Sequence, residues 1–582
     1  MADSELPGEC GGRGTLAPRS FAILIAVALV IGSVTSFAAL AFIEGYLWIS
    51  QILQVTAIKS GQFGGSAMTG WSVTIAVTTI GGIAVGTLLS RYTIQGKPHG
   101  PPDVIAAVAL RRSFVSFRSG LASTLAAMLA LGTGAPVGLY GPLVFMGALV
   151  GNIASRLRID FPGLPSIAVG CGVAAAVSTA FHAPIAGLIF THEVIHRHYS
   201  LRSFAPTVIA SITGYLFANK LFDKEPLLAV TFEEIGNRHE YLLLIALGCC
   251  AGLLAVGFQK LVHTAARIGS RIPWRLEFRT GLAGLVVGIT AIWIPQVLGP
   301  GTELMRAATI AESFGELDLV LLLAAKILLC TICLGFGFAG GIFGPSLVIG
   351  ALFGAVFWSL VDTWLPLSNS GLLPYVISGL VAVAAPVVGA PLTIIVFVFE
   401  LTHNYDITIY ATISTIASIL IGNQLLGQSY FERQLSQSGI DLESGREKAV
   451  LTAARVLDYA SAETPRCSGG ESVTGLFFHP SRQGLNEILV VDPNDRLLGR
   501  IHRADIIGKS GTAADLAEEV VLVFNQSTSL FDAAQSVSSC SGEILPIVDS
   551  ADGTLIGAAT KENIIAAYLK ISRELQEESH AH

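Results

Sequence analysis

The chain has 582 residues, of which 52% are apolar and only 13% are charged. Soluble domains carry about 25% charged residues, so this composition excludes a string of soluble domains and a disordered chain. The charges are unevenly distributed. Residues 451–582 hold 10 Lys/Arg and 18 Asp/Glu, whereas the first 450 residues hold 25 and 24. We therefore expect a near-neutral membrane body followed by an acidic, soluble C-terminal region.

Long uncharged stretches predict the membrane-spanning helices, because a bilayer core about 30 Å thick needs about 20 apolar residues in a helix. Stretches of that length predict single spans over Ser20–Ile43, Ser60–Ser90, Tyr241–Gln259, Thr280–Thr302 and Ile407–Phe431. Longer stretches with internal Gly and Pro clusters predict helices broken midway, over Ser119–Ser155, Ile327–Val361 and Thr363–Phe399. Broken helices leave backbone groups unpaired, which a membrane protein tolerates only where protein or a water-filled cavity receives them.

The apolar body contains an internal repeat. The segment Gly138–Pro142 recurs as Gly341–Pro345, 203 residues later. An Ala-Pro pair followed by Phe and Glu recurs from Ala183–Glu193 to Ala390–Glu400, 207 residues later. Duplicated halves with Gly/Pro-interrupted segments at matching positions are typical of transport proteins whose substrate lies between the repeats.

The Gly-Pro segments predict helix starts with exposed N–H groups. A helix N-terminus carries about half a positive charge and binds anions. Two such starts, one from each half, predict an anion site that needs no basic side chain. The alternative is that these glycines serve close helix packing, as small residues do in membrane bundles.

Together these motifs resemble those of the CLC family of chloride channels and chloride/proton exchangers, from about Ser20 to Lys570. The resemblance implies an α-helical multi-pass membrane fold with an inverted repeat and re-entrant helices. It also implies a homodimer in the lipid bilayer with one chloride pore per subunit, both termini in the cytosol, and a location most typical of a prokaryotic inner membrane. No enzymatic activity, required cofactor or nucleic-acid partner is expected. The expected domains are residues 1–19 (N-terminal segment), 20–448 (pore, with halves meeting near 235/236), 449–572 (cytosolic pair) and 573–582 (disordered tail).

The resemblance also assigns the anion pathway. Its residues are His99, Tyr140, Gly141, Ile342, Phe343 and Tyr430. Tyr140 stands at the position of the exchangers' gating glutamate, and Val194 at that of their inner proton glutamate. A phenol, with a reference pKa near 10, and a valine make poor proton carriers, which favours a passive channel. The alternatives are an exchanger with another proton route, or a transporter of bicarbonate, nitrate or fluoride.

His99 stands where the family has an anion-contacting serine. An unperturbed imidazole titrates near pH 6.5, so this residue predicts that pH tunes anion occupancy. The alternative is a neutral histidine that is hydrogen-bonded to nearby backbone.

Two intramembrane carboxylates, Glu193 and Glu400, occupy matching places in the repeat. Charges in lipid are costly, so we expect both to face the interior and to bond backbone groups at broken helix ends. The alternative is a direct role in permeation. Glu193 also lies in His192-Glu193-Val194-Ile195-His196, which matches the zinc-protease pattern H-E-x-x-H. An intramembrane zinc protease is therefore a remote alternative. No metal site is expected, because the repeat already accounts for Glu193.

The C-terminal region shows a second repeat. Glu487–Asp492 and Glu543–Asp549 are similar β-rich segments, each followed by a Gly-containing strand and a short helix. This arrangement resembles a tandem CBS domain pair. The resemblance implies that Asp505 can hold the ribose of an adenine nucleotide, whereas Asn563 occupies the equivalent place in the second copy. We expect nucleotide binding at one site at most, and a purely structural or dimerising pair is an equal alternative.

Overall fold

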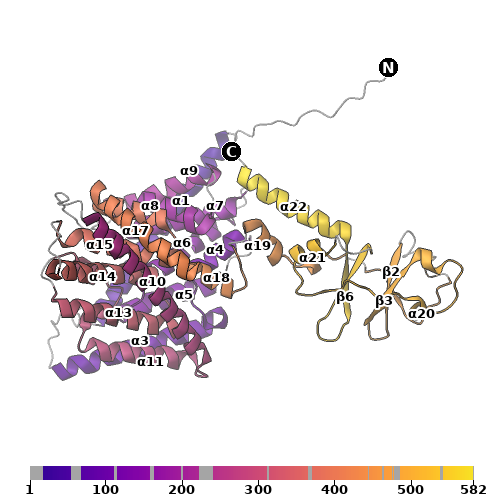
Figure 1. Cartoon of the computed structure of the whole chain (residues 1–582), viewed down its shortest axis with the longest axis horizontal. Helices are drawn as coiled ribbons and strands as arrows, with labels where there is room; N and C mark the ends of the chain where they lie inside the picture. Colours follow the sequence, from indigo (N-terminus) through magenta and orange to yellow (C-terminus); the bar gives the residue numbers. More distant parts are fainter. Residues whose placement is uncertain are drawn as a thin grey trace, which may run out of the picture. The chain divides into compact units, whose positions relative to one another are not determined.

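The structure is a computed structural model. It describes residues 18–53, 55, 67–110, 115–156, 163–197, 201–221, 240–310, 314–364, 370–442, 445–461, 464–474, 476, 486–537 and 542–580. The chain forms two compact units (Figure 1). Unit 1 lies within residues 1–108 and 113–434, and unit 2 within residues 109–112 and 435–582. The expected boundary at 448/449 falls inside helix α19 of unit 2.

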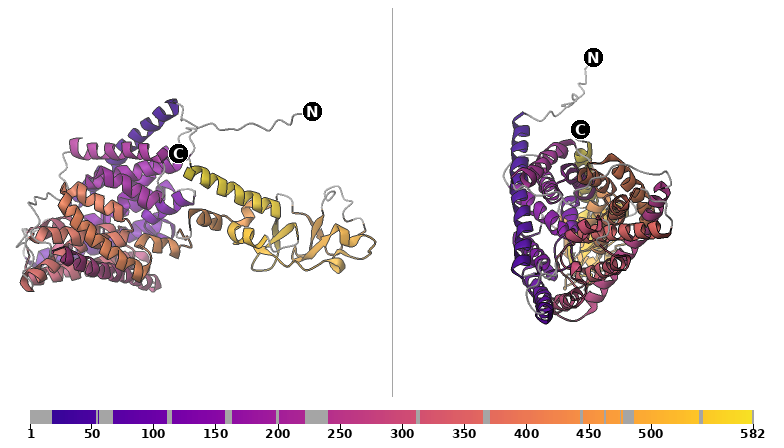
Figure 2. Two further views of the ribbon diagram at one scale, coloured as in Figure 1. Left: turned by 45° about the horizontal axis from the view of Figure 1, so that its top comes forward. Right: turned by 90° about the vertical axis from the view of Figure 1, so that its left-hand side faces the viewer.

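Unit 1 is entirely helical in its described part. Its helices are α1 (Pro18–Ile52), α3 (Ala67–Tyr92), α4 (Pro101–Ala109), α5 (Phe117–Gly132), α6 (Tyr140–Ala154), α7 (Leu164–Phe181), α8 (Pro184–Phe190), α9 (Leu201–Leu216), α10 (Glu240–Arg271), α11 (Leu276–Ala291), α12 (Thr302–Ala308), α13 (Glu316–Gly335), α14 (Phe343–Trp364), α15 (Leu372–Val388), α16 (Pro391–Thr402), α17 (Tyr405–Leu426) and α18 (Tyr430–Gln437). Helix α1, in indigo, runs along one side of the unit (Figure 2, right).

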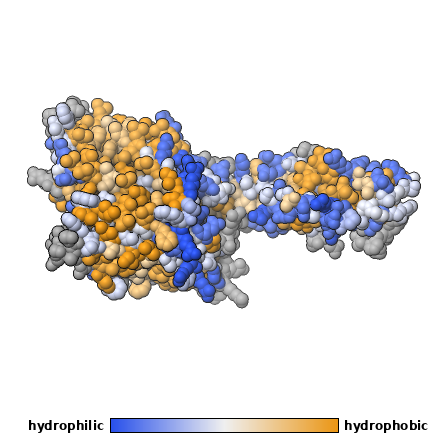
Figure 3. All heavy atoms as spheres, turned by 90° about the horizontal axis from the view of Figure 1, so that it is seen from below, coloured by the Kyte–Doolittle hydropathy of each residue, from blue (hydrophilic) through white to orange (hydrophobic). Residues whose placement is uncertain are grey.

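The composition and surface of unit 1 are those of a membrane protein. Seven helical segments in the described residues are long and apolar enough to cross a bilayer. Hydrophobic residues cover most of the face of this unit seen in Figure 3, and hydrophilic residues gather in a strip at one end. The predicted multi-pass membrane body is therefore confirmed.

The long apolar stretches break at their Gly and Pro clusters, as the sequence predicted. Helix α5 ends at Gly132 before α6 begins at Tyr140, and α13 ends at Gly335 before α14 begins at Phe343. Helix α15 runs on through Pro386 and stops only at Gly389, whose positive φ of 75° ends the helix. The single span predicted over Thr280–Thr302 is wrong. Helix α11 stops at Ala291, and a 3₁₀ turn (Pro295–Val297) follows, with positive φ at Gly299 and Gly301.

The two halves meet in an antiparallel crossing. Gly138 and Gly341 form an isolated antiparallel bridge, in keeping with an inverted repeat. Other repeated glycines serve packing. A Cβ on Gly147 would collide with the carbonyl oxygen of Gly172, and one on Gly350 with that of Gly379. These glycines allow α6 to pack tightly on α7, and α14 on α15, so the packing interpretation is confirmed at these positions.

Unit 2 is a mixed α/β body. Its described elements are α19 (Arg446–Ala453), β1 (Arg466–Ser468), β2 (Glu487–Val491), β3 (Leu497–His502), α20 (Ala513–Leu516), β4 (Phe524–Asn525), α21 (Leu530–Val537), β5 (Ile544–Val548), β6 (Leu555–Thr560) and α22 (Lys561–His580). The sheets β1-β2-β3 and β4-β5-β6 share one topology, in which a parallel pair is followed by an antiparallel pair. Both antiparallel pairs shift register at the same place, after Val490 and after Ile547. The predicted C-terminal repeat is present.

The C-terminal tail departs from expectation. The residues predicted to be disordered from 573 onward continue α22 as far as His580. Leu575 is buried, and the Ser572 hydroxyl donates a hydrogen bond to Glu447 Oε1 at 2.6 Å. These contacts hold the helix beyond the point where its composition suggested fraying.

Candidate anion site

The starts of α6 and α14 are brought together by a short backbone ladder. The Gly138 N–H donates to Gly341 O, and the Gly341 N–H donates to Gly138 O, both at 2.8 Å. A Cβ on Gly138 would lie 2.7 Å from Gly341 O, and one on Gly341 would lie 2.9 Å from Gly141 N. Only glycine allows the two chains to approach this closely, so the ladder fixes both helix starts side by side.

Both helix starts lack a capping side chain. The residue before α6, Leu139, provides no side-chain hydrogen bond. Ile342 and Phe343 are buried, and no acceptor among the described residues takes their amides. The first N–H groups of a helix have no acceptor within the helix, and together they attract negative charge. Two such ends from opposite halves therefore form a buried, uncharged donor site suited to a small anion.

Tyr140 covers this site with an aromatic cluster. Its ring stacks on Phe181 with centroids 3.8 Å apart, and lies 5.7 Å from Phe343. Phe181 in turn meets Phe397 edge-on at 4.7 Å. The Tyr140 side chain is enclosed, and a Cβ on Gly344 would lie 3.5 Å from its ring. An uncharged ring, rather than a carboxylate, thus lies against the start of α14.

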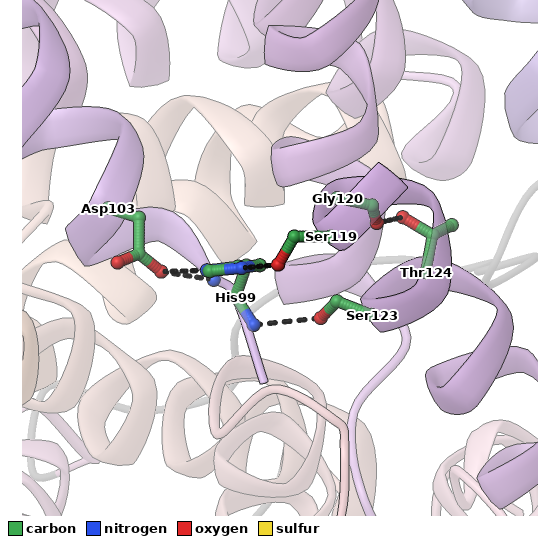
Figure 4. Close-up of polar contacts among 7 residues, drawn as sticks. His99, Asp103, Ser119, Gly120, Ser123 and Thr124 are labelled. Carbon is green, nitrogen blue, oxygen red and sulfur yellow. Dashed lines mark hydrogen bonds and ion pairs between the residues drawn. The ribbon is translucent and has the colours of Figure 1, made fainter. Parts of the chain in front are cut away.

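His99 lies in a polar cluster beside α6 (Figure 4). Its Nε2 lies 2.7 Å from Ser119 Oγ, and its Nδ1 lies 3.5 Å from Asp103 Oδ2. Its backbone N–H donates to Ser123 Oγ at 2.7 Å. The ring stacks on Phe145 of α6, with centroids 5.2 Å apart. Both ring nitrogens therefore face side chains, so the alternative of a ring bonded to backbone is wrong.

Ser119 and Ser123 were not identified from the sequence. They are four residues apart on α5, so they lie on one face of that helix. That spacing was the available signal, but it does not reveal which loop the face meets. Asp103 also accepts the Gly100 N–H at 2.9 Å, which fixes the turn leading into α4.

A second pair of helix starts is capped by carboxylates. Glu193 accepts hydrogen bonds from the N–H groups of Leu392 and Thr393 at the start of α16, at 3.0 and 2.8 Å. Glu400 accepts those of Ile185 and Ala186 at the start of α8, at 2.9 and 2.7 Å. Each half thus caps a broken helix of the other. The hydrogen bonds that we expected from both glutamates to backbone groups at broken helix ends are present.

The zinc-protease pattern lies on a π-helical segment, Thr191–His196. The rings of His192 and His196 are 5.5 Å apart, but Glu193 is engaged at the start of α16. In the described residues, no group of three or more His, Cys, Asp or Glu side chains is placed to hold a metal. Val194 is buried in the same segment.

Two further predicted residues lie outside this cluster. Tyr430 begins α18, where its ring packs on His263 at 5.1 Å and its hydroxyl accepts a hydrogen bond from Gln434 Nε2 at 3.0 Å. Its ring contacts among the described residues are His263 and Phe431, not Tyr140 or Phe343. Asp505 lies in unit 2, on a short 3₁₀ helix, Arg503–Ile506.

A multi-pass helical body with opposed halves and paired, uncapped helix starts in its interior is the architecture expected of a membrane protein with an anion site. Residues 81–423 match the family described as voltage gated chloride channel. The chain belongs to this family.

Relatives and solved structures agree on the fold. A putative ClcB-like chloride channel protein of Ralstonia nicotianae is 26% identical over 423 residues, which are 72% of this chain and 98% of that protein. The voltage-gated ClC-type chloride channel ClcB of Escherichia coli O157:H7 is 26% identical, over 71% of this chain and 98% of its own length.

Among solved structures, a slow cyanobacterial Cl⁻/H⁺ antiporter has a TM-score of 0.65 at 21% identity, covering 73% of this chain and 99% of its own. A eukaryotic CLC transporter has a TM-score of 0.64 at 17% identity, and its likeness extends over 94% of this chain and 98% of its own, into unit 2. The sequence relatives are named channels and the antiporter structure is not, so the likenesses do not choose between conduction and exchange.

Proposed function

We propose that the protein is a passive chloride channel of the CLC type, with one pore in each subunit of a homodimer. The observation that carries this proposal is the pair of uncapped helix starts at Tyr140 and Phe343, covered by an aromatic ring. Backbone donors bind an anion without fixed charge. A phenol does not shed its proton at neutral pH, so the ring acts as an obstruction rather than as a proton carrier.

The absence of carboxylates at both expected proton stations supports conduction over exchange. Tyr140 and Val194 occupy the positions at which the family's exchangers carry glutamates. The nearby carboxylates, Glu193 and Glu400, are engaged as caps. The runner-up, an anion/proton exchanger, requires a route that avoids Tyr140 and Val194.

The homodimer is supported by an apolar face. Helices α8, α9, α16 and α17 expose large hydrophobic side chains at Ile185, Phe204, Leu392, Ile416 and Leu420. Such a face fits either lipid or a second copy, and the family likeness favours the second copy. Chemical crosslinking of cysteines introduced at Ile416 and Leu420 in membranes tests this arrangement. Crosslinked dimers are expected, and exclusively monomeric products contradict it.

For unit 2 we propose a cytosolic CBS pair that binds an adenine nucleotide at one site at most, through Asp505. In the second copy, Asn563 stands at the place equivalent to Asp505, so that place has no carboxylate. The Asn563 N–H donates to Thr560 Oγ1 at 3.1 Å, at the start of α22. Titration of the full-length protein with a fluorescent ATP analogue tests this. No more than one bound nucleotide per chain is expected, and it should be lost on Asp505→Ala. Two nucleotides per chain contradict it.

Chloride efflux from proteoliposomes, with internal pH recorded and a potassium shunt present, tests the channel. Fast efflux without proton movement is the expected result. Efflux coupled to a fixed number of opposing protons overturns the channel in favour of exchange. If chloride does not leave the proteoliposomes but bicarbonate, nitrate or fluoride does, that anion rather than chloride is the substrate.

A further inference from the structure

His99 is a buried titratable side chain with a route to solvent. Its side chain is 8% exposed, whereas that of its partner Asp103 is 42% exposed. On the other side, its Nε2 reaches Ser119 Oγ, which is buried. The three groups form a chain that leads from solvent through Asp103 to the imidazole and on to a buried hydroxyl (Figure 4).

This chain lies beside the proposed anion site. Pro101, two residues after His99, packs on the start of α6, where a Cβ on Gly141 would lie 3.7 Å from Pro101 Cδ. Two peptide units span at most about 7.6 Å between Cα atoms. The His99 ring also stacks on Phe145, in the second turn of α6. Phe145 is five residues beyond Tyr140, a rise of about 7.5 Å along α6, so a charge on the stacked ring is on the order of 10 Å from an anion at the helix starts.

We propose that His99 is a proton-binding site coupled to the anion site, so that an anion at the helix starts and a proton on His99 bind together. This rests on the anion site proposed above. One proton passes from solvent to Asp103 and on to the imidazole. Its arrival offsets the charge of the anion, so the pair binds without a change in net charge.

The hydrogen bonds around the ring show how the proton is accommodated. In the neutral imidazole, Nε2–H donates to Ser119 Oγ, and the unprotonated Nδ1 faces Asp103, from which it takes the proton. In the imidazolium, both nitrogens are donors, so the new Nδ1–H points to Asp103 while Nε2–H still donates to Ser119 Oγ. Because the proton enters and leaves through Asp103 alone, it is bound but not transported, which is compatible with a passive channel.

The surroundings of His99 contain no competing ionisable contact in the described part of the chain. From α4 the ring meets Asp103, from α5 it meets Ser119, and from α6 it meets Phe145. The nearest basic residues in sequence, Lys97 and Arg118, are exposed, and the ring contacts described above include neither of them. A unit charge about 10 Å away, at an effective dielectric constant of about 20, changes anion affinity by about tenfold.

Chloride titration of the full-length protein by calorimetry, at pH 5.5 and pH 8, tests the proposal. The wild type should bind chloride about tenfold more tightly at pH 5.5, and His99→Asn should bind equally at both values. His403→Asn, at an exposed C-cap of α16, is the matched control and should keep the wild-type pH dependence.

A second readout needs no variant. Repeating the wild-type titration near pH 6.5, in buffers of different ionisation enthalpy, measures protons taken up per chloride. Fractional uptake supports the proposal. Chloride binding with neither pH dependence nor proton uptake, or pH dependence that survives in His99→Asn, overturns the proton site and leaves the channel standing. Absence of chloride binding at every pH overturns both.

Discussion

The molecule contains two pairs of broken-helix starts that differ in what occupies them. At α8 and α16, the N–H groups are taken by Glu400 and Glu193, each from the opposite half. At α6 and α14, the corresponding groups are buried and meet no capping side chain among the described residues. The same backbone geometry thus serves once as a structural joint and once as a set of backbone donors that no described side chain caps. Two helix starts bind carboxylates of the protein, and in our proposal an anion from solution binds where the protein supplies none.

Removing the Tyr140 ring, which covers the uncapped starts of α6 and α14, should have the largest effect on chloride flux. Tyr140→Ala is expected to raise chloride flux by about tenfold or more, as for a barrier lowered by about 1.4 kcal/mol. The reason is that the ring stacks on Phe181 and lies at the start of α14. Stopped-flow chloride efflux measures this. Tyr140→Phe keeps the ring and should stay close to wild type. Unchanged flux in Tyr140→Ala would remove the ring from the pathway.

Separating the uncapped ends should impair both folding and flux. In Gly138→Ala, a Cβ would lie 2.7 Å from Gly341 O. We expect a loss of about 1–3 kcal/mol in the free energy of unfolding, as for overpacked sites, together with loss of flux. Gly257→Ala on α10 is the control, since a Cβ there meets nothing within 4 Å. Thermal unfolding in detergent compares them. Equal stability of the two variants would contradict the close crossing.

Weakening the glutamate caps at the starts of α8 and α16 should lower the stability of the protein without changing its anion binding. Glu193→Gln and Glu400→Gln each keep one acceptor oxygen but lose the charge that strengthens bonds to the helix starts. A loss of about 1 kcal/mol each is expected, with chloride affinity close to wild type. Thermal unfolding and chloride titration measure the two properties. A large change in chloride affinity would show that these glutamates belong to the anion pathway.

The smallest effect is expected at a capped helix end exposed to water. In unit 2, Asp515 Oδ2 accepts the Thr512 hydroxyl and N–H at 2.6 and 3.0 Å. The hydroxyl bond, followed by the backbone bond, lowers the pKa of Asp515 below its usual value. Because the folded-state pKa is the lower one, the stabilisation is present above the unfolded-state pKa of about 3.9 and is lost as pH falls through the folded value.

Asp515→Asn should therefore lower the unfolding temperature of unit 2 slightly at pH 7 and not at all near pH 2. Thermal scans of the full-length protein at both pH values check this. An equal difference at the two values would mean that the carboxylate charge is not what stabilises this turn.

Local sequence signals account for much of the architecture. Gly and Pro clusters marked the helix breaks, and the matching positions of Glu193 and Glu400 indicated their roles as caps. The prediction of a single span over Thr280–Thr302 was wrong because the hydropathy stays high across a turn made by Pro295 and Gly299.

The hydrogen-bond partners of His99 could not be predicted from the sequence, for a different reason. Its contacts with Ser119 and Ser123 join a loop to a helix 20 and 24 residues away. Such pairing depends on how α4, α5 and α6 pack, which no local pattern encodes. The prediction of a disordered tail was wrong for a similar reason, because Leu575 and Ser572 gain their contacts only in the folded unit 2.

Anomalous diffraction from crystals grown in bromide tests the central claim most directly, because bromide replaces chloride and is located without reference to flux. The account predicts a bromide peak within hydrogen-bonding distance of the Ile342 and Phe343 amides, and none at the starts of α8 and α16, where Glu400 and Glu193 lie. Ordered bromide at the capped ends, or its absence from the uncapped ends at saturating concentration, would contradict the account.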